Sequence, residues 1–116
     1  MANRAFAVPE SRQGDDMHRA KIEVPAKTIR DFCRRHHIRR LAFFGSVLRE
    51  DFRADSDVDV LVEFEPDRVP GLAFFAMQDE LSRILGRQVD LNTPQFLSPY
   101  IRGEALAEAE EQYVAP

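Results

Sequence analysis

The segment of this chain that most constrains its fold is DVDVLVEF, residues 57–64. Side chains of two kinds alternate along most of it, and a period of two predicts a β-strand. One face of that strand carries Val58, Val60, Val62 and Phe64, and the other carries Asp57, Asp59, Leu61 and Glu63. Because aspartate is disfavoured in strands, two aspartates at its start indicate a role that offsets this cost.

Asp57 and Asp59 lie two residues apart, so their side chains leave the same face of the predicted strand about 6–7 Å apart. Carboxylates at that separation repel each other unless a cation lies between them. A hard cation with oxygen ligands, Mg²⁺ above all, relieves the repulsion and can also hold substrate phosphates. The alternative is that one or both aspartates only begin the strand in solvent.

Asp90 offers a third carboxylate, in the segment QVDLN between Val89 and Leu91. This segment predicts a short strand, and a position beside residues 57–64 would bring Asp90 to the same metal ions. Three carboxylates on two short strands suit phosphoryl or nucleotidyl transfer with two metal ions.

Gly45 and Ser46 follow IRRLAFF, residues 38–44, which predicts another short strand. A glycine there lets the backbone approach a ligand closely, and Ser46 would open a brief helical turn whose N–H groups favour phosphate. The alternative is a serine that caps the turn, which is a frequent arrangement. The Gly-Ser pair alone is weak evidence, but its position before the strand that carries the carboxylates predicts a site for phosphate and metal.

Three helices are predicted around these strands. One begins near Val24, a second covers residues 72–85 and ends at Gly86, and a third covers residues 100–109. The order helix, strand, strand, helix, strand, helix predicts a small α/β (α+β) domain over residues 22–116. Residues 1–21 are polar and broken by proline and glycine, which predicts a flexible N-terminal tail.

Composition limits the classes of function. The net charge of -4 argues against broad binding to nucleic acid. Cys33 is the only cysteine, so no intrachain disulfide is possible, and its apolar helical position favours the core. No apolar run approaches the roughly 18 residues of a membrane span, and the first residues lack the apolar region of a signal peptide. We therefore expect a cytoplasmic protein that needs no membrane.

Other residues have both a structural and a functional interpretation. His36 and His37 are interpreted as solvated residues at a helix end, because no cysteine or carboxylate lies at metal-ligand spacing beside them. The nearby arginines form either a solvated helix end or a contact with RNA or a partner: Arg34, Arg35, Arg39 and Arg40. Three apolar residues of the second helix cannot all face inward, so one is available to a partner: Phe74, Phe75 or Met77.

Gly45-Ser46, then ten residues, then Asp57-Val58-Asp59, with Asp90 downstream, resembles the nucleotidyltransferases of the DNA polymerase β superfamily. The whole stretch GSVLREDFRADSDVDVLVEF is similar to that of the minimal nucleotidyltransferases (MNT), often encoded as antitoxins beside HEPN-domain ribonuclease toxins. The similarity covers about residues 24–110. It implies the nucleotidyltransferase fold, a small mixed β-sheet with helices packed on one side.

The resemblance also implies roles for the carboxylates. Asp57 and Asp59 would bind Mg²⁺, in a site for two ions, together with the triphosphate of a nucleotide. Asp90 would complete the metal site and help to activate the acceptor hydroxyl. These three residues are the implied catalytic and metal-binding set.

Four further residues form the implied nucleotide-binding set: Gly45, Ser46, Arg49 and Ser56. Gly45 and Ser46 would hold the terminal phosphates, and Arg49 matches an arginine of the GSRARG-like form that neutralises phosphate charge. This sequence departs from that form at two positions: Val47 replaces its first arginine, and Glu50 replaces its second glycine. Glu50 adds a negative charge near the expected phosphates.

The function that the resemblance implies is Mg²⁺-dependent transfer of AMP from ATP to a tyrosine hydroxyl of a cognate HEPN ribonuclease toxin, which silences the toxin. The alternative is a non-catalytic antitoxin that neutralises the HEPN toxin by forming a complex with it. A nucleotidyltransferase for a small molecule such as an aminoglycoside is the third hypothesis, ranked last because such enzymes usually carry a further domain.

Overall fold

The computed structural model describes residues 20–116. The elements follow in the order α1 (Ala26–Arg35), β1 (Ile38–Phe44), the 3-10 turn η1 (Gly45–Leu48), β2 (Val58–Phe64), α2 (Ala73–Leu85), β3 (Val89–Asn92), the 3-10 turn η2 (Pro94–Phe96), α3 (Pro99–Glu108) and β4 (Glu110–Val114). The predicted order of helices and strands is confirmed, and β4 is an addition. Most of the predicted tail, residues 1–19, lies outside the described residues, whereas Ala20 packs against the core.

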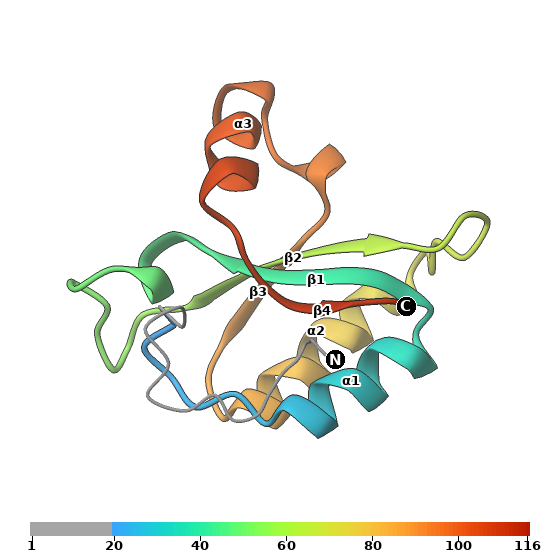
Figure 1. Ribbon diagram of the computed structural model, residues 1–116, viewed down its shortest axis with the longest axis horizontal. Helices are drawn as coiled ribbons and strands as arrows, with labels where there is room; N and C mark the ends of the chain where they lie inside the picture. The colour runs from blue at the N-terminus through green and yellow to red at the C-terminus, as the bar shows by residue number, and fades with distance from the viewer. Residues whose placement is uncertain (1–19) are drawn as a thin grey trace.

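The four strands form one mixed sheet in the order β3-β2-β1-β4 (Figure 1). Strand β2 runs parallel to β3 and antiparallel to β1, and β1 pairs antiparallel with β4. Helix α2 connects the two parallel strands, as such a connection requires a crossover. The predicted small mixed sheet is confirmed. The strand that carries Asp90, the third carboxylate, lies beside residues 57–64 as predicted.

The main core lies between one face of the sheet and helices α1 and α2 (Figure 1). The alternation predicted for β2 is confirmed, because its valines are fully buried against these helices. The largest of the fully buried side chains around them belong to Ile29, Phe32, Leu41, Phe43, Met77 and Leu81. Burial of each such side chain stabilises the fold by roughly 1.5–3 kcal/mol.

Helix α3 lies on the opposite side of the sheet from α1 and α2 (Figure 1). Its one buried residue, Ala105, joins Phe44, Leu61 and Leu97 in a second, smaller apolar cluster. The predicted packing of helices on one side therefore describes α1 and α2, while α3 covers part of the other face. The reason lies in the alternation of β2, because Leu61 emerges on the same face as Asp59 and needs apolar cover.

Two predictions about apolar side chains are confirmed in α1 and α2. Cys33 is fully buried, and burial raises the pKa of its thiol well above the usual range. On α2, Phe74 and Met77 face the core, whereas the Phe75 side chain is 65% exposed. Within residues 20–116, the helices are all too short or too polar to cross a membrane.

Strand β4 is the element that the sequence does not predict. Its five residues, EEQYV, show no buried side chain and only Tyr113 packs against the main core. An edge strand needs to bury little apolar surface, so its sequence lacks the usual strand signal. The pairing with β1 is supported by Arg40, whose guanidinium contacts Glu63 and Glu111.

Candidate active site

Gly45 is in close contact with the carboxylate of Asp59 at the end of β1. Phe44 pairs with Asp59 across the antiparallel strands, and Gly45 follows with a φ of 77°. A Cβ atom on Gly45 would lie 2.3 Å from Asp59 Oδ2, which no real contact allows. Glycine is therefore required at position 45 for two reasons. Its backbone is in the left-handed region, and the Asp59 carboxylate leaves no room for a side chain.

Asp59 and Asp90 lie directly beside each other, because they are register partners on the parallel strands β2 and β3. Residues in register on neighbouring strands point to the same face, at a strand spacing of about 4.8 Å. Asp59 is half-buried and Asp90 is exposed. Asp57 is exposed and immediately precedes β2, so it belongs to the connecting loop, and the strand begins one residue later than predicted.

The electrostatics of the site centre on Asp59. Burial, and then the negative charges of Asp90 and Asp57, raise the pKa of its carboxyl to about 6. Arg49 acts in the opposite direction, and Glu108 adds to the increase. The three predicted carboxylates therefore interact electrostatically, and the site carries more negative charge than Arg49 compensates.

The fit of these residues to Mg²⁺ rests on that charge and on their chemistry. Carboxylate oxygens are the ligands that Mg²⁺ prefers, and a cation would relieve the repulsion around Asp59. Among residues 20–116, however, no three histidine, cysteine, aspartate or glutamate side chains are gathered closely enough to hold a metal ion. The pair formed by Asp59 and Asp90 is the part of the predicted metal site that the fold brings together.

The predicted turn after β1 is the 3-10 turn η1, and it differs from a serine-capped helix. Phe44 occupies the position before its first residue, and no side chain caps it. Ser46 is half-buried, and its carbonyl accepts a hydrogen bond from the Arg49 N–H at 2.9 Å. Val47, at the position of an arginine in the GSRARG-like form, is fully buried in the main core. That position therefore serves packing in this chain.

Glu108, the last residue of α3, reaches the same turn and was not predicted. Its Oε2 accepts a hydrogen bond from the Gly45 N–H at 2.8 Å, and its Oε1 accepts one from Arg49 Nη2, also at 2.8 Å. The sequence did not indicate this contact, because Glu108 lies far from the turn along the chain, in an ordinary acidic helix. Glu50, the glutamate noted in the sequence, is instead paired with Lys21 at 3.0 Å and has a 96% exposed side chain.

Ser56 stabilises the loop in front of Asp57. Its N–H donates to the Arg53 carbonyl at 3.1 Å, and its Oγ accepts from the Arg53 N–H at 3.0 Å. Arg87 holds the same loop, because its Nη2 donates to the carbonyls of Arg53 and Ala54 at 2.7 and 2.8 Å. The Arg87 guanidinium also lies 4.5 Å from the centre of the Phe52 ring. Arg87 is a positioning residue that the sequence did not reveal.

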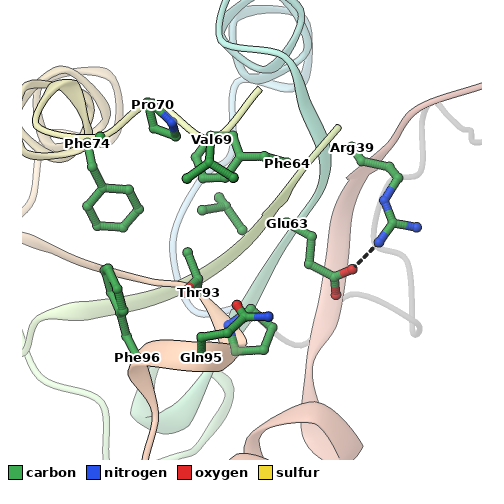
Figure 2. A pocket seen from close by; sticks show the side chains of 12 residues that line it. Arg39, Glu63, Phe64, Val69, Pro70, Phe74, Thr93, Gln95 and Phe96 are labelled. Carbon is green, nitrogen blue, oxygen red and sulfur yellow. Dashed lines mark hydrogen bonds and ion pairs between the residues drawn. The ribbon is translucent and has the colours of Figure 1, made fainter. Parts of the chain in front are cut away.

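A pocket of about 460 Å³ opens elsewhere, between the end of β2, the segment before α2 and η2 (Figure 2). Phe74 and Phe96 line it with rings in edge-to-face contact, and Arg39 pairs with Glu63 at its rim. None of the predicted site residues lines this pocket. It is mostly apolar, so it does not resemble a phosphate or metal site.

The ion pairs of α1 and β1 favour the structural interpretation of the basic residues. Arg35 and His36 both contact Glu80, and Arg39 and Arg40 both contact Glu63. His36 is thus half-buried and paired with a carboxylate, which corrects the prediction of a solvated histidine. The sequence could not reveal this pair because Glu80 lies on another helix.

Comparison with known proteins connects this geometry with a family. The family model described as a nucleotidyltransferase domain matches residues 26–111, which include every residue predicted for the site. The chain belongs to the nucleotidyltransferase domain family. Within this nucleotidyltransferase, the contact between Gly45 and Asp59 and the pair of Asp59 with Asp90 join the motif's separate parts in space.

Three similar proteins show which nucleotidyltransferases this chain resembles. The protein adenylyltransferase MntA of Thermococcus cleftensis is 37% identical over 75 residues, which cover 64% of this chain and 74% of that protein. A solved structure provisionally described as a minimal nucleotidyltransferase is 36% identical, with a TM-score of 0.62, and the match covers 73% of this chain and 86% of that one. A complex of tri-AMPylated Shewanella oneidensis HEPN toxin with MNT antitoxin shares the fold, with 18% identity, a TM-score of 0.58 and coverage of 78% of this chain and 70% of that chain.

Proposed function

We propose that this nucleotidyltransferase is a Mg²⁺-dependent protein adenylyltransferase that acts as an antitoxin. It transfers AMP from ATP to a tyrosine hydroxyl of a cognate HEPN ribonuclease toxin and so neutralises the toxin. The observation that carries the proposal is the junction of Gly45, Asp59 and Asp90, where the turn after β1 lies against a carboxylate pair. The adenylyltransferase name of the MntA relative supports the reaction type.

The chain's own residues would divide the work between phosphate and acceptor. The Gly45 N–H and the Arg49 guanidinium are donors at the turn, which suits them to the terminal phosphates of ATP. Ser46 lies between them and would join this group. On the neighbouring strand, Asp90 is exposed and would orient and help to deprotonate the acceptor hydroxyl.

The reaction itself is a displacement at the α-phosphorus of ATP. The tyrosine oxygen forms a bond to that phosphorus, the bond to the bridging oxygen breaks, and pyrophosphate leaves. Asp59 and Asp90, joined by Asp57 from the loop before β2, would hold Mg²⁺, which would supply charge neutralisation at the phosphates and increase the acidity of the hydroxyl. The raised pKa of Asp59 is the sign of a site built to receive positive charge.

Labelling of a purified HEPN toxin with radioactive ATP tests the proposal. We expect Mg²⁺-dependent labelling that Asp59→Asn and Asp90→Asn each reduce by about a hundredfold or more, since loss of a group that only supports a metal ligand already costs about 10–100-fold. Asp79→Asn, at an exposed position on α2, is the matched control and should leave labelling unchanged. Full labelling by the Asp59→Asn variant would exclude the catalytic role.

A non-catalytic antitoxin that binds the HEPN toxin is the second candidate. It is favoured by large apolar side chains on the surface, of which Tyr100 on α3 is 93% exposed and Phe75 on α2 is 65% exposed. Under this hypothesis, Asp59→Asn would still inhibit the toxin ribonuclease at equimolar ratio without ATP. Inhibition that needs ATP and proceeds at substoichiometric antitoxin would instead support the enzyme.

A further inference from the structure

The carboxylate of Glu108 occupies two of the hydrogen-bond donors at the turn. One oxygen accepts the Gly45 N–H and the other accepts an Arg49 N–H, each at 2.8 Å. A carboxylate that bridges a backbone amide and a guanidinium uses the same kind of donors that bind phosphate oxygens. The side chain that does so is largely buried, with 24% of its surface exposed.

Glu108 and a phosphate oxygen cannot both accept the hydrogen bond of the Gly45 amide. The guanidinium of Arg49 has several N–H groups and can be shared, but the Gly45 amide has a single proton to donate. The carboxylate of Asp59 lies at the position that a Cβ atom of residue 45 would take, so it blocks any side chain there. Glu108 therefore occupies the donors that the predicted terminal phosphates need.

Helix α3 is held to the rest of the molecule by contacts that do not involve Glu108. Arg102 donates to the carbonyls of Pro94 and Leu97 at 2.7 and 2.9 Å, and Ala105 packs in the second apolar cluster. These contacts would remain if the Glu108 side chain left the turn. Its release needs no unfolding of α3.

We propose that Glu108 is an internal competitor for phosphate, which holds the Gly45 and Arg49 donors in the nucleotide-free protein and must leave before a nucleotide binds. The inference rests on the proposed function, since it takes the turn as the phosphate site. Because of this competition, a ligand must bind the turn more tightly in order to displace the Glu108 carboxylate. A triphosphate with several charged oxygens displaces the carboxylate more readily than a weaker anion does.

Binding of inorganic tripolyphosphate without Mg²⁺ tests this inference, because it isolates the turn from metal binding and from chemistry. We expect Glu108→Ala to lower the dissociation constant measured by calorimetry about tenfold, the scale of one hydrogen bond to a charged group. Glu108→Gln keeps the length of the side chain and removes its charge, so it should show a smaller gain. Glu104→Gln, exposed on the same helix, is the control and should bind as the unmodified chain does.

A second readout reports the contact itself. The Gly45 amide signal in a ¹H–¹⁵N spectrum should move in Glu108→Ala without any ligand, and should move in the unmodified chain on addition of tripolyphosphate. Weaker or unchanged tripolyphosphate binding in Glu108→Ala, including no binding in either protein, would overturn the inference. Absence of toxin labelling together with tighter tripolyphosphate binding would instead reject the proposed reaction and leave the role of Glu108 standing.

Discussion

The two halves of the candidate site are built in different ways. The carboxylate half rests on β2 and β3, where register alone places Asp59 beside Asp90. The proposed phosphate half rests on the turn after β1, where Gly45 and Arg49 donate hydrogen bonds to Glu108 at the end of α3. The first half depends on contacts between neighbouring strands, whereas the second depends on residues far apart in the sequence. Substitutions should therefore affect the halves differently.

The largest effect should come from Gly45→Ala, because Gly45 belongs to both halves. The added Cβ would lie 2.3 Å from Asp59 Oδ2, at a φ of 77° that alanine rarely adopts. We expect a loss of about 2–4 kcal/mol in the free energy of unfolding, measured in urea, and loss of toxin labelling. Gly71→Ala is the matched control, since its φ is 65° and nothing lies within 4 Å of its Cβ position. Equal losses in the two variants would show that the contact with Asp59 is unimportant.

The next effect tests the loop in front of the carboxylate half. Arg87→Ala removes two hydrogen bonds to the carbonyls of Arg53 and Ala54 and the contact with the Phe52 ring. We expect about 1 kcal/mol of destabilisation, because the two carbonyls belong to exposed residues and water can replace part of the lost hydrogen bonds. Toxin labelling should fall as well, with the larger change in kcat, and Arg87→Lys should restore only part of it because lysine lacks the planar fork.

If Arg87 contributes only to the stability of the fold, a different result is expected. In that case kcat of the folded fraction would stay unchanged, and lysine would restore stability and activity together. Arg83→Ala, at an exposed position on α2, controls for the loss of one positive charge. Its melting temperature and labelling should match those of the unmodified chain.

A smaller effect is expected at Asp59, where loss of the carboxylate should change the stability of the fold and the activity in different directions. Burial and the charges of Asp90 and Asp57 raise the pKa of Asp59 to about 6, above the usual value of about 3.9 for an unfolded chain. The folded state thus binds the proton more tightly, so the contribution of this group to stability is present below pH 4 and is lost as the pH rises through 6. After allowance for solvent screening, the loss amounts to about 1 kcal/mol.

Asp59→Asn should remove this pH dependence. We expect the variant to be as stable as the unmodified chain at pH 4 and about 1 kcal/mol more stable at pH 7.5, measured by urea unfolding. Mg²⁺ binding to the unmodified chain should reduce the difference. A variant that is less stable at both pH values would mean that the Asp59 carboxylate stabilises the ligand-free fold.

The contrast between the halves also explains what the sequence could reveal. The strand of Val58–Phe64, the partner strand of Asp90 and the glycine at the turn were predictable, because alternation and spacing are local properties. Strand β4 was missed because an edge strand buries little. Glu108 and Arg87 were missed because each acts across a long sequence separation, on partners that local patterns cannot identify.

The smallest effect should come from Glu50, the glutamate that the sequence places beside the expected phosphates. Its side chain is 96% exposed and pairs with Lys21, and exposed ion pairs contribute little to stability. Glu50→Gln should therefore leave both the melting temperature and the tripolyphosphate affinity unchanged, in contrast to Glu108→Gln. A gain in affinity equal to that of Glu108→Gln would mean that the net charge around the turn, and not the occupation of Gly45 and Arg49, limits phosphate binding. Two glutamates near one turn thus distinguish a general electrostatic effect from direct competition for two donors.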